Sequence, residues 1–238
     1  MIVLSGLVFA GTDSYSFEDV KEAYLNNRSI FKTKITNAVL KKLEEIDKLD
    51  IKLDFLDKIS TMSGTFARLR LKAEGSTSKN FRIHRIDFDL DEPKINMRKL
   101  WEKEKIELIR AKDLKFSLVI KEDDINNYFK SDKKNRKIKN PNIRITEKGI
   151  ELTGRANWWI FKTSFKLKGR FVIMNKTEIH FKADKIRVSI LPLPKSLLNG
   201  VMKKINPIYN LADLPFPVKI GRIRTLNKRM IIDSTNDR

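Results

Sequence analysis

Few side chains in this sequence have the type and spacing that catalysis requires. The two histidines, His84 and His180, lie far apart in sequence, each within an alternating pattern typical of a strand. No suitably spaced carboxylates accompany them, so a metal site is not indicated. The chain has no cysteine, no glycine-rich phosphate loop and no hydrolase motif. The paired acids Asp123-Asp124 and Glu44-Glu45 fit a helix start and a solvated helix face. We therefore expect no catalytic residue, no metal ligand and no cofactor.

The cations are the residues with the clearest binding chemistry. The chain has 50 Lys and Arg against 30 Asp and Glu, a formal net charge of +20. A field of this sign attracts phosphates, whether of nucleic acid or of lipid headgroups. A biased genome or a hot habitat would also produce a composition rich in Lys and Ile. Net charge alone therefore does not select the ligand.

Three segments carry the cations that we expect to face anionic headgroups. Residues 130–139 hold six Lys and Arg against one Asp, which predicts a flexible basic loop. A short amphipathic helix after Pro194 and the closing segment of the chain supply the others. The expected headgroup or membrane-surface residues are Lys133, Lys134, Arg136, Lys137, Lys139, Lys203, Lys204, Lys219 and Arg222.

Apolar periodicity predicts the elements that position these residues. From Phe17 to Ile46 apolar residues recur every three or four positions, which indicates a long amphipathic helix with Ser16 as its N-cap and a restart at Ser29. Beyond Asp50 the period becomes two, as in half-buried strands. The expected strands lie at 51–59, 67–74, 81–90, 114–120, 143–146, 150–153, 159–173 and 179–190.

Three further patterns refine this prediction. The apolar phase slips by one between Ile83 and Ile86, which predicts a β-bulge, and it slips again before Ile186. Residues 122–130 open with acids and close with Lys, which predicts a short helix. The segment 93–110 is either a short helix or a long loop.

Near the C-terminus prolines alternate with large apolar residues, in Leu191-Pro-Leu-Pro194 and in Asp213-Leu-Pro-Phe-Pro-Val-Lys-Ile220. Pro fixes its own φ and holds its predecessor extended, so these connections are stiff. They form either a rigid cover on the core or an apolar lip on a binding cavity.

The order of these segments, together with Ile205-Asn-Pro207 and the Asp124-Ile-Asn126 helix, resembles the bacterial lipomannan elongation factor A family of phospholipid-binding proteins. The resemblance runs from about Leu114 to Ile232. It implies a tubular lipid-binding type of fold, in which a curved antiparallel sheet wraps a long helix and leaves an apolar groove. It does not imply mannan synthesis.

We therefore expect an α+β fold in which a long, curved antiparallel sheet wraps the N-terminal amphipathic helix, with a short second helix near the C-terminus. The predicted function is the binding of a phospholipid or another acyl lipid in the groove, with transfer left open. The predicted lipid-binding residues are Phe31, Ile35, Val39, Leu43, Trp159, Phe161, Phe165, Leu167, Phe171, Phe181, Leu197, Val201, Ile205, Leu214 and Phe216.

The first ten residues are apolar and uncharged, and Val8-Phe-Ala10 fits a small-residue cleavage site. We interpret residues 1–10 as a signal-peptide remnant and residues 11–238 as a single lipid-binding-like domain. A buried first strand is the other interpretation. Export to the cell envelope or periplasm follows from the first, and a cytoplasmic location is the alternative. No later run approaches the roughly 20 apolar residues of a membrane span.

Two other functions use the same cations. Nucleic-acid binding would place phosphates on Lys and Arg and stack bases on exposed aromatic residues. The aromatic residues of this chain occupy alternating positions that should be buried, so nucleic acid is the less favoured partner. A scaffold module that uses its sheet edges is the other alternative, and the oligomeric state is left open.

Overall fold

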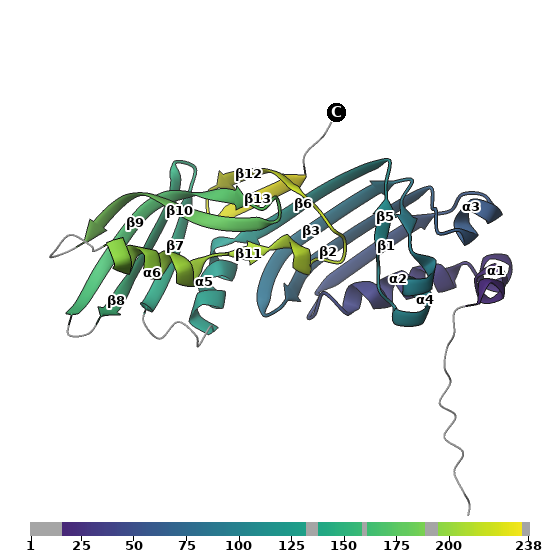
Figure 1. Cartoon of the computed structure of the whole chain (residues 1–238), viewed down its shortest axis with the longest axis horizontal. Coiled ribbons are helices and arrows are strands. Elements are labelled where there is room, and N and C mark those ends of the chain that lie inside the picture. Colours follow the sequence, from purple (N-terminus) through teal and green to yellow (C-terminus); the bar gives the residue numbers. More distant parts are fainter. Residues whose placement is uncertain (1–15, 132–137, 159–160, 189–194, 235–238) are drawn as a thin grey trace, which may run out of the picture.

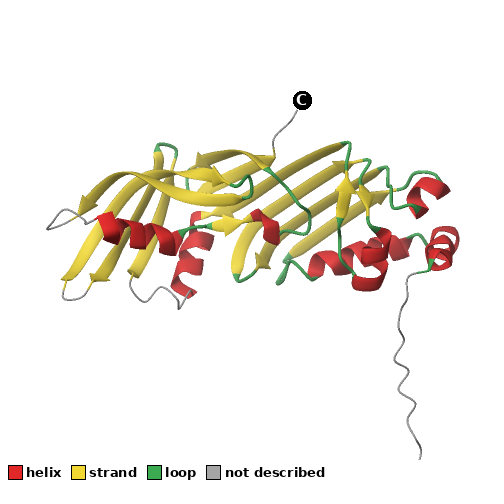
Figure 2. Cartoon of the chain, viewed as in Figure 1, coloured by secondary structure: helices red, strands yellow, loops and turns green. Residues whose placement is uncertain are grey.

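The computed structural model describes residues 16–131, 138–158, 161–188 and 195–234. They form an elongated α+β molecule (Figures 1 and 2) whose strands make two large antiparallel sheets and one two-stranded ribbon. Buried apolar side chains from both large sheets belong to one continuous core. The expected α+β class with antiparallel strands is confirmed.

The six-stranded sheet has the order β1-β2-β3-β6-β13-β12. Its strands are β1 (Lys48–Asp54), β2 (Arg68–Ser78), β3 (Phe81–Asp91), β6 (Asp113–Lys121), β13 (Arg229–Ser234) and β12 (Ile220–Leu226). Side chains alternate between the core and solvent along β3 and the first part of β2, as period-two patterns require, whereas the last four residues of β2 are all buried.

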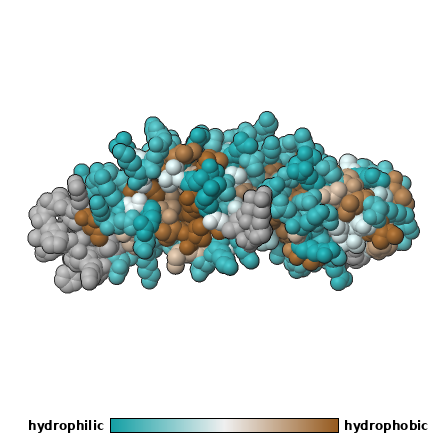
Figure 3. Space-filling model, turned by 90° about the horizontal axis from the view of Figure 1, so that it is seen from above, coloured by the Kyte–Doolittle hydropathy of each residue, from teal (hydrophilic) through white to brown (hydrophobic). Residues whose placement is uncertain are grey.

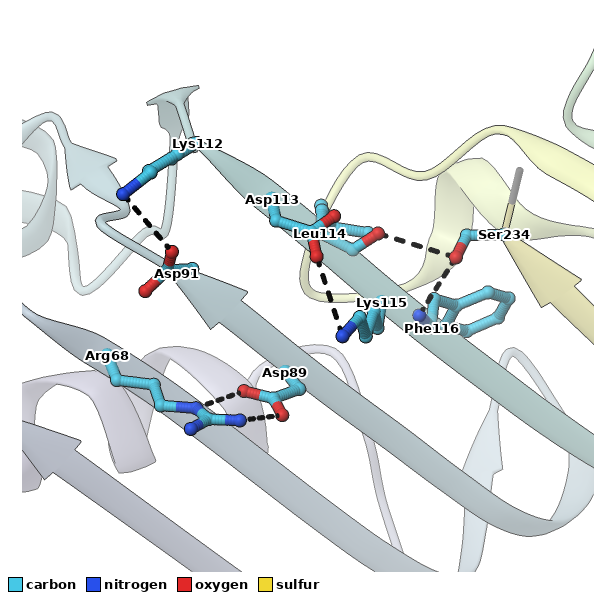
Figure 4. Close-up of polar contacts among 9 residues, drawn as sticks. All are labelled: Arg68, Asp89, Asp91, Lys112, Asp113, Leu114, Lys115, Phe116 and Ser234. Carbon is cyan, nitrogen blue, oxygen red and sulfur yellow. Dashed lines mark hydrogen bonds and ion pairs between the residues drawn. The ribbon is translucent and has the colours of Figure 1, made fainter. Parts of the chain in front are cut away.

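Ion pairs and the last strand stabilise the six-stranded sheet (Figure 4). Arg68 donates two hydrogen bonds to Asp89, at 2.7 and 2.5 Å. The Ser234 hydroxyl accepts from the Phe116 N–H at 3.1 Å and donates to the Leu114 carbonyl at 3.4 Å. The end of β13 is thereby joined to β6.

The five-stranded sheet has the order β11-β10-β9-β8-β7 and curls into half of a barrel (Figure 1). Its strands are β7 (Ile138–Thr146), β8 (Gly149–Trp158), β9 (Phe161–Met174), β10 (Glu178–Val188) and β11 (Tyr209–Asn210). The register of β9 and β10 shifts between Ala183 and Lys185. This shift confirms the irregularity expected before Ile186, and the β7–β8 hairpin is confirmed as well.

Helices cover the sheets at three places (Figure 1). They are α1 (Phe17–Asn26), α2 (Ser29–Leu40), α3 (Lys58–Met62), α4 (Met97–Lys103), α5 (Glu122–Ser131), α6 (Lys195–Ile205) and the 3-10 helix η1 (Leu211–Asp213), and the ribbon strands are β4 (Lys94–Ile95) and β5 (Leu108–Arg110). The expected helices after Pro194 and at 122–130 are confirmed. The segment 93–110 contains a short helix between two short strands.

The N-terminal stripe differs from the expectation of one long helix. Ser16 caps α1 by accepting from the Asp19 N–H at 3.0 Å, as expected. The backbone leaves the helix at Asn27, whose side chain accepts from the N–H of Ser29 in the turn that precedes α2. Because α2 ends at Leu40, Leu43 and Ile46 lie beyond it.

The predicted single long sheet around one helix is also replaced by a different arrangement. Strands close in sequence pair by short connections, so β1, β2, β3 and β6 form one sheet and β7 to β10 form another. Helix α5 interrupts the chain between β6 and β7. In Figure 1 α1 and α2 lie near one end of the six-stranded sheet, whereas α6 lies beside the five-stranded sheet.

Two local predictions on the strands are wrong. The strand expected to reach Ile59 ends at Asp54, because Asp57 accepts from the Ser60 N–H at 3.0 Å and begins α3. The β-bulge expected between Ile83 and Ile86 is absent, because the β2–β3 register is the same on both sides of this point. Gly75 and His84 are left out of the pairing, and Gly75 has a φ of 58°. Both strands continue through this position.

Two asparagine side chains pair with strand backbones of the five-stranded sheet. Asn126 of α5 donates to the Ile143 carbonyl at 2.9 Å and accepts from the Ile143 N–H at 2.7 Å. Asn206, after α6, does the same to Phe181, at 3.0 and 2.8 Å. Each amide supplies one donor and one acceptor, as a neighbouring strand would. Both asparagines belong to the motifs that carry the family resemblance.

Candidate lipid-binding site

The predicted lipid-binding residues of the N-terminal helix lie in the core of the six-stranded sheet. Phe31, Ile35 and Val39 of α2 are fully buried, and so is Leu43 beyond the helix. The Phe31 ring packs edge-on against three aromatic rings, those of Phe55, Phe66 and Trp101, with centroid distances of 5.7, 5.9 and 5.0 Å. This end of the core is thus filled by the protein's own rings.

A second group of predicted residues lies on the inner face of the five-stranded sheet. Their shared parity along β9 and β10 places them on one side of the strands, and α6 contributes two more. The buried members are Phe165, Leu167, Phe171, Phe181, Val201 and Ile205. The structure therefore divides the predicted lining between two sheets instead of gathering it around one helix.

The proline-rich connection packs onto the six-stranded sheet. Leu214 is 3% exposed and Phe216 is fully buried. The Phe216 ring lies 4.9 Å from that of Phe88, which lies 5.1 Å from that of Phe116. Of the two interpretations of this segment, a cover on the core matches the placement of these residues.

Some predicted site residues fall outside the description. Trp159, Lys133, Lys134, Arg136 and Lys137 lie outside the described residues. Phe161 and Leu197 belong to β9 and α6, and their side chains are likewise outside the described part of the structure.

The described cations of the predicted headgroup set are exposed but dispersed. Lys139 is on β7, Lys203 and Lys204 are on α6, and Lys219 precedes Arg222 on β12. Arg222 Nη2 lies 3.6 Å from Asp233 Oδ2, so part of its charge is neutralised. Elements from both halves of the molecule carry these cations, and sequence spacing did not reveal this.

The interior between the sheets contains three hydroxyl groups that sequence reasoning missed. Ser76, Ser78 and Tyr209 are buried, and their hydroxyl oxygens make no hydrogen bond of regular geometry among the described residues, although the Ser78 and Tyr209 hydroxyls lie close enough to interact with each other. Ser78 pairs with Phe81 across β2 and β3, and the Phe81 ring lies 5.0 Å from that of Tyr209. The run Gly75-Ser-Thr-Ser78 reads as the polar end of a strand, so nothing in it signals burial.

These hydroxyls are an energetic liability in the free protein. Burial raises the pKa of Tyr209 far above its usual range, so the phenol stays protonated and able to donate. A buried polar group without a partner costs about 1–3 kcal/mol. Such groups call for an explanation, and a bound molecule or water that accepts their hydrogen bonds is one.

The other titratable groups do not assemble into a reactive site. Burial raises the pKa of Asp124, whose carboxylate accepts from the Lys121 N–H at 2.9 Å, and burial lowers the pKa of His84. His180 Nε2 lies 2.9 Å from Glu178 Oε2. Within the described ranges no three His, Cys, Asp or Glu side chains are grouped to hold a metal ion.

Apolar side chains also reach the surface at the end of the molecule that carries α1 and α3. Ile59 is 81% exposed and Phe17 is 56% exposed. In Figure 3 hydrophobic residues lie at this end and also in a second area left of the centre, and hydrophilic residues cover much of the surface around them. Among the helices described, none has the length and apolar character that crossing a membrane requires.

A comparison of the sequence with known protein families is consistent with lipid binding in this apolar interior. A sequence model of the family described as LmeA-like phospholipid-binding matches residues 28–235. No curated protein and no solved structure gave a significant match. The family match extends well upstream of the region recognisable from motifs and confirms the resemblance noted there. The chain therefore belongs to the LmeA-like phospholipid-binding family.

Proposed function

We propose that the protein binds one phospholipid, with its acyl chains among the inner apolar side chains of the five-stranded sheet and its ester region at the junction of the two sheets. The family supports phospholipid binding. The observation that carries the location is the group of unpartnered hydroxyls of Ser76, Ser78 and Tyr209 inside an otherwise apolar core.

The oxygen atoms of a phospholipid and the buried hydroxyls of the protein are complementary in hydrogen bonding. Glycerol ester carbonyls and phosphate oxygens are acceptors, and Ser and Tyr hydroxyls are donors. A lipid oxygen at the junction would satisfy groups that are otherwise buried and unpaired, which removes their cost. The acyl chains would extend toward Phe165 and Phe181, whose side chains are 3% and 1% exposed. Entry of the chains requires the surrounding side chains to move, because protein cores are close-packed.

Three expectations from the sequence extend this proposal. They are transfer of the lipid between membranes, export of the protein to the cell envelope, and a single lipid-binding domain from residue 11 onward. A groove along the N-terminal helices is a further expectation, and it would require the rings around Phe31 to rearrange. All of these stay predictions.

The first experiment is to purify the protein from a bacterial host, extract it with organic solvent and identify bound lipid by mass spectrometry. We expect about one phospholipid per chain, since the proposed site holds one ester region. A well-folded protein that carries no phospholipid, and takes none up from mixed micelles, would contradict the proposed function.

A variant pair tests the position of the lipid. In Ser78→Ala/Tyr209→Phe two unpartnered hydroxyls are removed, so the lipid-free protein should be as stable as the wild type or more stable. Lipid retention should fall roughly tenfold, from two lost hydrogen bonds. Tyr24→Phe is the matched control, because the Tyr24 hydroxyl donates to the Leu56 carbonyl at 3.4 Å far from this junction. Equal retention by the double variant and the control would rule out the hydroxyls as lipid contacts.

A further inference from the structure

The outer faces of the two sheets differ in charge. The strands of the six-stranded sheet contain 12 Lys and Arg against 8 Asp and Glu, whereas those of the five-stranded sheet contain ten against three. On the six-stranded sheet ion pairs neutralise many of the cations, as at Arg68–Asp89, Arg70–Asp54 and Arg85–Asp87. The larger excess of positive charge therefore lies on the five-stranded sheet.

A hollow of about 400 Å³ opens on this sheet. Its lining residues are Arg144, Thr146, Lys148, Gly149, Ile150, Glu151, Lys168, Gly169, Asp184 and Lys185. Two glycines from the neighbouring strands β8 and β9 belong to this lining. A Cβ atom at Gly149 would lie 3.0 Å from the Gly169 carbonyl oxygen, and one at Gly169 would lie 2.0 Å from that of Lys182. The hollow is thus bounded partly by bare backbone.

The strand register places three of the lining cations in one row across the sheet. Arg144 lies opposite Glu151, Glu151 lies opposite Lys168, and Lys168 lies opposite Lys185. Residues directly opposite each other share a face, and like charges in such pairs destabilise a sheet. The Lys168–Lys185 pair is such a cost in the free protein, and an anion between the two ammonium groups would remove it.

The acids of the hollow form their ion pairs with cations that lie outside its lining. Glu151 pairs with Lys166 at 2.5 Å, and Asp184 pairs with Arg170 at 3.2 Å. Neither Lys166 nor Arg170 lines the hollow. The four cations that do line it, Arg144, Lys148, Lys168 and Lys185, have no ion-pair partner among the described residues.

We propose that this hollow binds the phosphate of anionic lipid headgroups and so holds the outer face of the five-stranded sheet against a membrane surface. The inference rests on the proposed phospholipid function, and it adds a second, surface site that the predicted headgroup residues do not include. Lys and Arg around an open hollow match phosphate oxygens in charge and in hydrogen bonding. Among the described residues no aromatic side chain lines the hollow, so this part of it lacks the stacking surface that single-stranded nucleic acid uses.

The test compares two variants of equal charge. The hollow variant carries Lys148→Gln, Lys168→Gln and Lys185→Gln. The control variant carries Lys48→Gln, Lys52→Gln and Lys72→Gln, three exposed lysines of β1 and β2 without an ion-pair partner among the described residues. Both lose three positive charges, so the long-range field changes equally. Circular dichroism melting verifies that both fold.

Binding is measured by co-sedimentation with phosphatidylcholine vesicles that contain one-fifth phosphatidylglycerol, and with pure phosphatidylcholine vesicles. We expect the hollow variant to bind the anionic vesicles on the order of 100-fold more weakly than the wild type. Each cation near such a surface raises the affinity roughly fivefold, and the variant lacks three of them. The control should change less than about fivefold, because its lysines lie on the other sheet, away from the hollow. Equal losses in both variants would overturn the proposal.

Further arms separate the two sites and the source of the phosphate. The hollow variant should still carry phospholipid, as detected by mass spectrometry. If neither the wild type nor either variant carries phospholipid, the interior site is refuted, whereas the vesicle result still tests the hollow. Inorganic phosphate should weaken the binding of the wild type to anionic vesicles no more than chloride of equal ionic strength does. Competition by micromolar phosphate would assign the hollow to a free anion instead of a lipid. A hollow variant that loses DNA binding but retains vesicle binding would also overturn the proposal.

Discussion

Replacing Asn126 with alanine tests how the β7 edge of the five-stranded sheet is closed. The Asn126 amide makes two hydrogen bonds with the backbone of Ile143, at 2.7 and 2.9 Å. Asn126 is 7% exposed and Ile143 is fully buried. Alanine would leave one N–H and one carbonyl of β7 without partners, in a place that water does not reach.

The magnitude follows from these two bonds. Each of the two backbone groups left unpaired costs about 1–3 kcal/mol, which already includes the lost hydrogen bond. Alanine has the higher helix propensity, which returns roughly 0.5 kcal/mol in α5. We therefore expect Asn126→Ala to lower the free energy of unfolding by about 1.5–5.5 kcal/mol. This is a large part of the 5–15 kcal/mol typical of a domain.

Urea unfolding followed by circular dichroism measures this loss. The matched control is Asn127→Ala, because Asn127 is the next residue of α5 and is exposed. Its propensity gain is the same, so the difference between the two variants isolates the backbone pairing. We expect a clearly lower midpoint for Asn126→Ala and little change for Asn127→Ala. Similar midpoints would refute the idea that the amide closes the sheet edge.

Two other predictions concern stability. Hydrogen bonds from Lys41 and Asn37 hold the pKa of Glu104 below its ordinary value of 4.5. This stabilisation is present above pH 4.5 and is lost as pH falls through the lowered pKa, so Glu104→Gln should melt below the wild type at pH 7 and near it at pH 3; a gap that is constant with pH would contradict the assignment. Gly169→Ala should cost about 3 kcal/mol or more in urea unfolding, since its Cβ would meet the Lys182 carbonyl oxygen at 2.0 Å; an unchanged midpoint would show that the strands separate freely there.

Local patterns predicted those elements whose conformation is set by interactions between residues close in sequence. The acidic opening of α5, the β7–β8 hairpin and the shift near Ala183 were all readable, because caps, turns and side-chain alternation act within a few residues. The helix break was readable only in part. The restart at Ser29 was predicted, but the stripe of apolar residues continued past Leu40, where α2 ends.

The candidate site was less readable because it depends on contacts distant in sequence. The predicted residues Phe31 and Phe181 are both buried in the same continuous core, yet they pack against different sheets. Ser78 and Tyr209 come together through Phe81, and no local pattern relates them. The row of Arg144, Lys168 and Lys185 arises from register across four strands, so it has no signature along the chain.

By itself the sequence determined the positive charge, the absence of recognised catalytic motifs, the alternation of the strands and the motifs of a phospholipid-binding family. These properties depend on composition and on short spacings. Only the tertiary structure decided how the strands divide into two sheets, which asparagines close an edge, and where unpaired hydroxyls and cations gather. The physical reason is that strand pairing and burial are settled by contacts between distant segments, and many arrangements satisfy the same local pattern.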